Sequence, residues 1–525
     1  MHTILRWCLL SGLLVIESEK MMKKMIIFLV LILTSRSFAI NLGSLDTSFS
    51  NDGVSDGWLL DGVTGGSVSG QSVAVDRQGR ILVAGVEVIF GQGQRVMVRR
   101  YLPDGTYDNT LNSAGLGSVL NKPYSNNIVK VGLELDEFNN FFLAYSYNSC
   151  EGVDTCIDTF VYHISESGAV LGGASISFDA GSVVSSQDDD FVDMVYFTVE
   201  KKLAVAIDVK VDNSPTYNKD FGVVLLNVFL GGGVVADTGF GNNSKSSCFF
   251  NQDGTGHNNT DEARAITANF DSNTVIVGGW SFEGNGAALT GKNMSFCEFN
   301  LFQQDGNPPG TVIEKWSTET LPNSPFIYDE EILYDVKYKT EYVDTGSGLV
   351  GVKTLFATGF TNGANSDDFA LVKYVYDGMD WVLDTSFGPF GTGWAITGFS
   401  LLDSNSGFVD TEDVAKSLFV ESEDGSILIG GYSEWYDLSD RRINGALLKF
   451  TKNGILDKNW GDNKSGKTMV VLDDITNIKT ISDITVSGSA ESIFTTGTYP
   501  SSNNGNDSLL ISKHINDSIF AGSFD

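Results

Sequence analysis

The stretch that decides the fold runs from Val414 to Gly461 and reads VAKSLFVESEDGSILIGGYSEWYDLSDRRINGALLKFTKNGILDKNWG. Its apolar runs are rich in β-branched and aromatic residues, which favour strands. Asp424-Gly425 and Asn453-Gly454 fall between these runs, and such pairs supply the positive φ angles that tight hairpin turns require. The stretch therefore predicts a small antiparallel sheet of three strands joined by turns.

The same order of strands and turns recurs along the chain, each copy adding a fourth strand. The second strand of each copy is the clearest anchor, because it is short, apolar and often ends in Gly. It reads ILVAG, FFLAY, LAVAI, VIVGG, LFATG, ILIGG and IFTTG, starting at Ile81, Phe141, Leu203, Val275, Leu355, Ile427 and Ile493. The copies are 60–80 residues apart, so the insertions fall in loops.

Seven copies of a four-stranded antiparallel sheet predict an all-β, seven-bladed β-propeller. A sheet of this size is barely stable alone and has to pack on its neighbours. We find no capping repeats for an open stack, whereas a ring buries both faces of each sheet and leaves short edges. We expect residues 40–525 to form this single domain. Gly57–Leu60 resembles the fourth strand of a copy but precedes every other strand in the chain. We expect it to complete the last blade and close the ring.

The first 39 residues have the pattern of a signal peptide. Lysines at 23 and 24 precede the apolar run Met25–Leu33, and Ser37-Phe38-Ala39 resembles a cleavage site. A membrane anchor is the alternative, but the run is short for a bilayer. Residues 1–20 are interpreted as a spurious extension upstream of a start at Met21 or Met22. We expect export to the periplasm, cell surface or extracellular space, with no integral membrane segment afterwards.

The chain is strongly acidic, with 34 Lys and Arg against 66 Asp and Glu and a net charge of −32. Removal of residues 1–39 takes away five basic and two acidic side chains, which gives −35. Such a surface repels nucleic acid and anionic lipid and attracts cations or basic partners. The alternative is that the acidity only keeps an exported monomer soluble.

Four cysteines remain after the leader, and an even number in an exported chain favours disulfides. Cys150 and Cys156 flank a short loop between two strand runs, which predicts one pair. Cys248 and Cys297 then form the second pair by elimination. A zinc site is disfavoured, because no Cys-x-x-Cys occurs and the histidines are scattered.

A recurring turn element gives the chain a family resemblance. Leu45-Asp46-Thr47-Ser48-Phe49 returns as Leu383-Asp384-Thr385-Ser386-Phe387-Gly388, with echoes at 236–241 and 456–461. An Asp before Ser or Thr, followed by an aromatic residue, is typical of a side-chain-capped turn with a buried ring. Together with DRQGRILVAG at 76–85 and RYLPDG at 100–105, the element resembles the delta-60 repeat of bacterial exported proteins. The resemblance implies export and a propeller-like architecture, and no reaction.

Acidic residues gather where the inner strands are expected to start. If the first strand of each blade is innermost, these carboxylates lie near one mouth of the channel. Calcium prefers several carboxylate and carbonyl oxygens together, so a bound Ca²⁺ is one hypothesis. The alternative is that each acid accepts backbone hydrogen bonds from the neighbouring blade. The candidate residues are Asp193, Asp261, Glu262, Asp335, Asp413 and Asp483.

The loops between second and third strands are expected on the same face and carry aromatic residues beside charged ones. Exposed aromatics next to Arg are common anchors for protein partners, and aromatic platforms also suit sugars. Singly, each is more typical of local packing. The candidate ligand-binding residues are Trp280, Glu283, Trp435, Tyr436, Arg441 and Arg442.

The face that carries the loops between second and third strands is called the long-loop face. The sequence thus favours an exported binding, adhesion or scaffold module that uses this long-loop face to bind a protein or glycan. No Gly-x-Ser-x-Gly, His-Glu-x-x-His or phosphate-binding Gly-Lys-Ser/Thr motif occurs. A carbohydrate-active enzyme, either a glycosidase or a lyase using channel carboxylates, is the first alternative. A purely structural envelope component is the second.

Overall fold

The chain divides into two units, Met1–Leu42 and Gly43–Asp525, and all described strands belong to the second. Among the described residues, no helix has the length and apolar character to cross a bilayer. The computed structural model describes residues 42–50, 56–111, 128–148, 157–178, 189–210, 219–250, 260–282, 291–304, 306–318, 330–344, 346, 348–362, 367–399, 401–403, 407–409, 412–437, 440–470, 480–487, 492–500 and 506–516.

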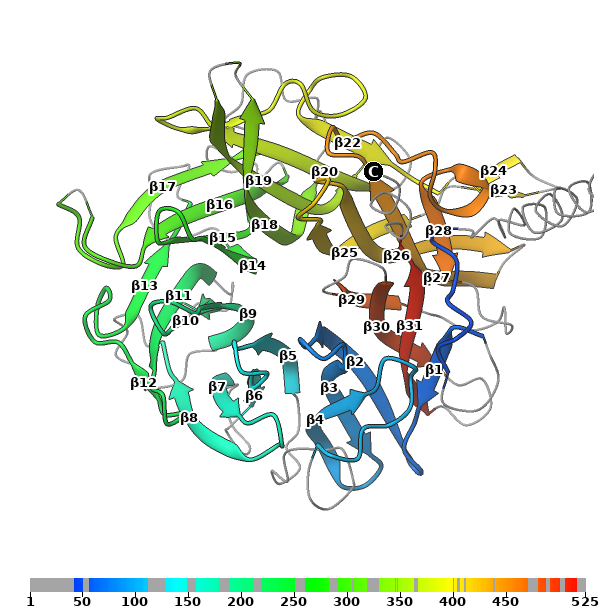
Figure 1. Ribbon diagram of the computed structural model, residues 1–525, viewed down its shortest axis with the longest axis horizontal. Coiled ribbons are helices and arrows are strands. Elements are labelled where there is room, and N and C mark those ends of the chain that lie inside the picture. The colour runs from blue at the N-terminus through cyan, green and yellow to red at the C-terminus, as the bar shows by residue number, and fades with distance from the viewer. Residues whose placement is uncertain are drawn as a thin grey trace, which may run out of the picture. The chain divides into compact units, whose positions relative to one another are not determined.

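The second unit is a seven-bladed β-propeller, as the repeats predicted, with its antiparallel blades following one another in chain order (Figure 1). The first strand of each blade contacts the first strand of the next blade, so these strands form the inner wall of the ring. The inner strands are β2 (Gly66–Val75), β5 (Ile128–Leu135), β9 (Asp189–Phe197), β14 (Asp261–Asn269), β18 (Glu331–Asp344), β25 (Glu412–Val420) and β29 (Thr480–Val486).

The second strands form the centre of each blade and are buried on both faces. In the third blade, the run from Leu203 to Ile207 is 0% exposed throughout. Their near-continuous apolar sequences follow from this double burial, because both faces pack against neighbouring blades. These strands are β3 (Ile81–Ile89), β6 (Phe141–Asn148), β10 (Lys202–Lys210), β15 (Thr274–Phe282), β19 (Leu349–Asn362), β26 (Ile427–Asp437) and β30 (Ser492–Pro500).

The third strands continue each sheet outward. They are β4 (Gly93–Tyr101), β7 (Ile157–Ile164), β11 (Lys219–Val228), β16 (Lys292–Asn300), β20 (Asp367–Tyr376), β27 (Asp440–Phe450) and β31 (Asp507–Ile515).

The outer strands are shorter and more varied. In the third and fifth blades, two short strands share the outer position. In the first blade three strands are described, and residues 112–127 before β5 lie outside the described residues. The outer strands are β1 (Trp58–Asp61), β8 (Val170–Ile176), β12 (Val234–Ala236) with β13 (Lys245–Cys248), β17 (Val312–Ser317), β21 (Trp381–Leu383) with β22 (Trp394–Thr397), and β28 (Lys467–Val470). The connections carry a ribbon of β23 (Leu401–Asp403) with β24 (Gly407–Val409), and a short 3-10 helix, η2 (Asp462–Lys464).

The ring is closed by its N-terminal strand, as expected. β1 pairs antiparallel with β31 and completes the last blade, with Leu59 opposite Ile511. The strand is one residue shifted from the predicted Gly57–Leu60. Before β1 in the chain, Gly43 and Asp46 donate their amides to the carbonyls of Ile515 and Lys513, both at 2.8 Å, so residues 43–46 extend the pairing along β31.

The recurring Leu-Asp-x-Ser-Phe element is a side-chain-capped turn with a buried ring, as predicted. The Ser48 amide donates to Asp46 Oδ1 at 3.0 Å, and the Phe49 ring is fully buried. In the fifth blade, the Ser386 amide donates to Asp384 Oδ1 at the same distance, and Phe387 is again buried. Both turns lie beside third strands, away from the inner wall, so they serve the architecture.

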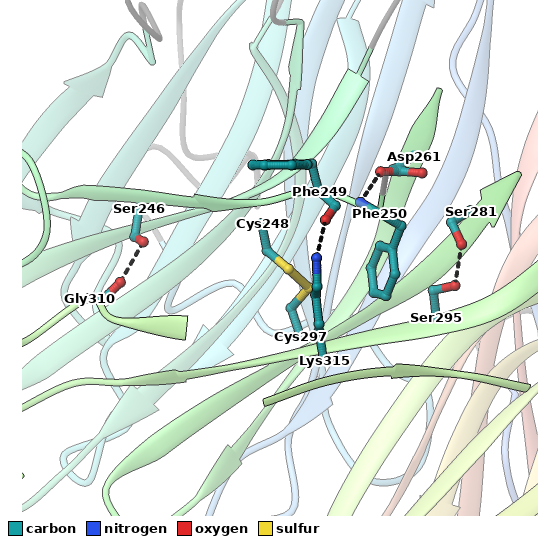
Figure 2. The surroundings of a disulfide bond; sticks show 10 residues. All are labelled: Ser246, Cys248, Phe249, Phe250, Asp261, Ser281, Ser295, Cys297, Gly310 and Lys315. Carbon is teal, nitrogen blue, oxygen red and sulfur yellow. Dashed lines mark hydrogen bonds between the residues drawn. A yellow bond between two sulfur atoms is a disulfide. The ribbon is translucent and has the colours of Figure 1, made fainter. Parts of the chain in front are cut away.

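One of the two predicted disulfides is present, and it links two blades. Cys248 of β13 in the third blade is bonded to Cys297 of β16 in the fourth blade (Figure 2). The same interface holds a hydrogen bond of 3.0 Å from Lys315 Nζ to the Phe249 carbonyl. The predicted pair Cys150–Cys156 lies outside the described residues.

Replacing Cys248 and Cys297 by Ala is expected to lower the free energy of unfolding by about 2–4 kcal/mol. The bond closes a chain segment with a sequence separation of 49, and cross-links of this length restrict the unfolded chain. Thermal melts of the wild type and the double variant test this. A melting temperature equal to that of the wild type would contradict the expected stabilisation.

Candidate functional site

Each inner strand carries a β-bulge near its start, and this irregularity builds the candidate site. In β14 the pairing jumps from Ala263 to Ala265, in β18 from Leu333 to Asp335, and in β25 from Ala415 to Ser417. A bulge leaves one residue unpaired and re-aims its side chain. In all seven blades a residue of the bulge lines the central channel: Gln71, Lys130, Val192, Arg264, Tyr334, Lys416 and Ser482.

The channel contains two adjoining cavities of about 550 Å³ and 430 Å³, and all seven bulge residues line both of them. The larger cavity lies toward the strand starts, where Glu262 and Tyr432 join its wall. The smaller one extends along the inner strands to acidic residues such as Asp335 and Asp483. The bulge residues therefore lie between a mouth and a deeper acidic section of the channel.

Three of the bulge residues are basic, and two of them lie over the ring of one tyrosine. Lys416 Nζ lies 3.4 Å from the centroid of the Tyr334 ring, and Arg264 Cζ lies 5.8 Å from it. Lys130 Nζ donates to the carbonyl of Arg264 at 3.5 Å. The electron-rich ring face favours positive charge, so Tyr334 partly offsets the repulsion between these cations.

The electrostatic environment of the two lysines disfavours their charged forms. Burial, together with the positive charges of Arg264 and Lys130, lowers the pKa of Lys416 to about 7. Burial also lowers the pKa of Lys130, and the charge of Arg264 adds to this effect. The negative charges of Asp193, Asp335 and Asp483 act in the opposite direction on Lys130 and partly compensate it, although its pKa is still lowered. Lys416 is the lysine whose charged form is disfavoured by burial and by both neighbouring cations.

The other cations at this mouth are paired with carboxylates. Arg264 forms an ion pair with Glu262 of its own strand. Lys219 lies between Asp190 and Asp208, at 3.1 Å and 2.7 Å from their carboxylate oxygens. Among the described residues, no such ion pair is formed by Lys130 or Lys416. The channel mouth thus presents two lysines that can receive an anion.

Three of the six residues predicted to bind calcium line the smaller channel cavity and connect adjacent blades. Their carboxylates accept hydrogen bonds from backbone amides of the next inner strand, which was the alternative interpretation. Burial raises the pKa of Asp193, and it raises that of Asp483 to about 6. The bonds run from Ile266 to Asp193 at 3.5 Å, from Leu418 to Asp335 at 2.7 Å, and from Val73 to Asp483 at 2.8 Å.

Asp261 and Asp413, at the starts of their strands, connect blades in a second way. The Phe250 amide at the end of the third blade donates to Asp261 at 2.6 Å, as Figure 2 shows, and the Phe399 amide donates to Asp413 at the same distance. Burial raises the pKa of Asp261 to about 8, and the charge of Asp220 adds to the shift. Within the described ranges, no three His, Cys, Asp or Glu residues are grouped to hold a metal ion, and calcium stays a prediction.

The predicted ligand-binding residues fall into two groups. Trp280 is only 5% exposed and packs beside Ile332 and Phe360, so it is a packing residue and not the exposed anchor that we expected. Four others belong to the β26–β27 hairpin. Trp435 and Tyr436 pair with Arg442 and Arg441 in the β26–β27 hairpin, but their side chains, like Glu283, lie outside the described residues.

Sequence reasoning missed Lys130, Arg264 and Lys416. A signal was nevertheless present, because aligning the inner strands on their bulges places a basic residue at one equivalent position in three of the seven copies. That pattern has meaning only once the position is known to face the channel.

No protein-family model matches the sequence, and no curated protein matches it. Solved propellers resemble the fold. They include the periplasmic gluconolactonase PpgL of Pseudomonas aeruginosa (10% identity, TM-score 0.40, covering 86% of this chain and 97% of that one). An ulvan lyase has 10% identity and a TM-score of 0.40 over 91% and 94% of the two chains. The extracellular region of plexin A4 has 12% identity and a TM-score of 0.45 over 86% and 40%. At these values, the neighbours carry no functional argument.

Proposed function

We propose that this protein is an exported binding module whose central channel receives a small carboxylate-bearing ligand, such as the acidic end of a glycan. One observation carries the proposal. Lys130, Arg264 and Lys416 converge on one cavity of a chain whose net charge is −32. We also propose that residues 1–39 direct export of the protein and that its repeats are of the delta-60 type.

Lys416, with the partly compensated Lys130 beside it, favours an anionic ligand on energetic grounds. Removing an ammonium group from water is costly unless a counter-charge or hydrogen-bond acceptor replaces the water. A ligand carboxylate between Lys130 and Lys416 supplies that counter-charge, and it restores the charged form of both side chains. Charge-assisted hydrogen bonds of this type are shorter and stronger than neutral ones.

The size and surroundings of the cavity favour a small ligand over a polyanion. A volume of about 550 Å³ lies within the range of small-molecule sites. Tyr334 and Tyr432 line its wall and provide aromatic surface against which a sugar ring can pack. A long acidic polymer is repelled by the rest of the molecule, whereas a single acidic end meets the local positive charge.

The proposed ligand enters from the long-loop face. Glu412, at the start of β25, pairs with Glu434, which leads to the tip of the β26–β27 hairpin. The bulge residue Lys416 is four positions further along β25, so the channel mouth and this hairpin share one face. Trp435 and Arg441 at the hairpin tip are proposed to contact the portion of a glycan or protein that remains outside the channel.

Calorimetric titration with digalacturonate and with the neutral digalactose tests the proposal. We expect heat from the acidic sugar and much less from the neutral one. Lys416 is protonated below its pKa of about 7, so affinity for the acidic sugar should fall about tenfold from pH 6 to pH 8. The sugar carboxylate stays ionised throughout this range. Equal affinity for both sugars, or no change with pH, would contradict the proposal.

A uronate lyase is the second candidate function, because Lys416 is partly neutral near pH 7 and adjoins Tyr334. Neutral Nζ would accept the proton α to the carboxylate, while Arg264 stabilises the resulting negative charge. The electron pair of the C–H bond forms a C=C bond, and the bond to the glycosidic oxygen breaks. That oxygen takes the Tyr334 hydroxyl proton, which Lys416 then replaces. Ultraviolet absorbance of an unsaturated product distinguishes this enzyme from a binding module.

A further inference from the structure

A third cavity, of about 240 Å³, lies between the fourth and fifth blades, apart from the two in the channel. It is lined by the β14–β15 turn, the β16–β17 connection and the β20–β21 turn. In an antiparallel blade these turns lie on the face opposite the loops between second and third strands. The cavity therefore lies away from the channel mouth.

A buried carboxylate without a cation forms one wall of this cavity. Glu298 of β16 is 4% exposed. Its oxygens accept hydrogen bonds from the Thr274 hydroxyl, from Asn269 Nδ2 at 3.4 Å and from Trp381 Nε1 at 2.8 Å. All three donors are neutral, and no Lys, Arg or His in the described chain forms an ion pair with Glu298. Buried carboxylates in proteins are normally paired with a positive charge.

A second side chain at the cavity has a free acceptor. Asn300 is 1% exposed, and its Nδ2 donates to the carbonyls of Phe302 and Asn307 at 3.0 Å and 3.3 Å. Its Oδ1 is buried and accepts no hydrogen bond from the described residues. Buried polar atoms are nearly always satisfied by a protein group, a water molecule or a ligand. The cavity therefore requires a hydrogen-bond donor at this position.

Glu314 places another carboxylate at the cavity, opposite Glu298 in the register of β16 and β17. Its Oε1 accepts the Trp381 amide at 2.8 Å. Burial raises the pKa of Glu314 to about 7, and the charges of Glu298, Asp380 and Asp377 add to the shift. The carboxylates at this cavity therefore disfavour one another's charged forms.

Among the described residues that line the cavity, Lys353 of β19 is the one cation. Its Nζ donates to the Ser272 hydroxyl and lies 5.2 Å from the centroid of the Tyr376 ring. It forms no ion pair with a carboxylate of the described chain. The carboxylates of Glu298 and Glu314 therefore remain open to a positive ligand.

We propose that this cavity binds a small organic cation through a primary ammonium group held by Glu298, Glu314 and Asn300 Oδ1. An ammonium group has three N–H donors, and the cavity offers three acceptors that match them. The ligand charge compensates Glu298, and one donor satisfies Asn300. A metal ion is less suited, because the described residues provide no group of three His, Cys, Asp or Glu there.

Calorimetric titration of the intact protein with cadaverine tests the proposal, with 1,5-pentanediol, choline and galactose as comparison ligands. We expect cadaverine to bind at least about tenfold more tightly than the diol, which lacks charge, and choline, which lacks N–H donors. Its affinity should rise about tenfold from pH 6 to pH 8, since Glu314 loses its proton over this range. Galactose binding without cadaverine binding, or equal binding of cadaverine and the diol, would overturn the proposal.

Two variants with opposite expected effects sharpen the test. Glu314→Gln should weaken cadaverine binding at least about tenfold and remove its pH dependence. Lys353→Met keeps the apolar stem over Tyr376 and removes the competing charge, so affinity should rise severalfold. Asp367→Asn is the matched control, because this carboxylate also has a raised pKa, of about 6, but lies outside the cavity. Unchanged affinity in both test variants would overturn the proposal. Lys416→Met should leave cadaverine binding intact, which separates this site from the channel.

Discussion

Deleting residues 43–62 is expected to lower the free energy of unfolding by at least about 5 kcal/mol, because this segment closes the ring. Phe49 and Leu59 are 0% and 1% exposed, and burial of such side chains contributes about 1.5–3 kcal/mol each. The backbone pairs between β1 and β31 would also be lost. A chain of this length should then melt at least about 5 °C lower.

The loss should be accompanied by self-association, since β31 becomes an unpaired edge strand. Light scattering during the melt measures this. A matched pair of point variants separates closure from chain length. Phe49→Ala should cost about 3–5 kcal/mol, whereas Phe90→Ala, at a ring that is 58% exposed, should cost almost nothing. A deletion variant that melts like the wild type would show that the ring does not depend on β1.

Replacing Lys416 by Met and Arg264 by Gln together is expected to weaken digalacturonate binding roughly 100-fold or more. Each side chain would lose a charge-assisted hydrogen bond, which contributes about 1.5–3 kcal/mol. The two residues share Tyr334 as a neighbour, so their effects need not add, and both single variants are required. Calorimetric titration at pH 6, where Lys416 is charged, measures the change.

Lys452→Met is the control for these variants, because Lys452 lies on an exposed turn outside the channel. It removes one positive charge and should leave affinity within about twofold of the wild type. Lys416→Met alone should also abolish the change in affinity between pH 6 and pH 8. A double variant that binds like the control would move the ligand site out of the channel.

The local features were predictable because their interactions span few residues. The Asp46 carboxylate caps a turn only two positions away, so the Leu-Asp-x-Ser-Phe element could be read directly as a turn. The number of blades followed from counting copies of one strand. Ring closure followed from the leftover strand at the N-terminus, because a four-stranded blade that ends after its third strand requires a partner.

The acidic residues show where sequence reasoning stopped. Their gathering at the starts of inner strands was visible, and both calcium binding and blade-to-blade hydrogen bonding were open. The choice between these two roles depends on which groups each carboxylate contacts in the folded ring. Asp483 is 410 positions from Val73, whose amide it accepts, and only the closed ring brings the two strands together.

The sequence by itself determined the repeat, the blade number, the capped turns and the closing strand. These features depend on hydrophobic periodicity, turn chemistry and counting, which are encoded locally. The tertiary structure alone decided the chemistry of the channel cavities and of the cavity between the fourth and fifth blades. Lys130 and Arg264 are 134 positions apart and meet only because each inner strand bulges at the same level of a closed ring. Glu298 meets the Trp381 indole, 83 positions away, only because the fifth blade packs against the fourth.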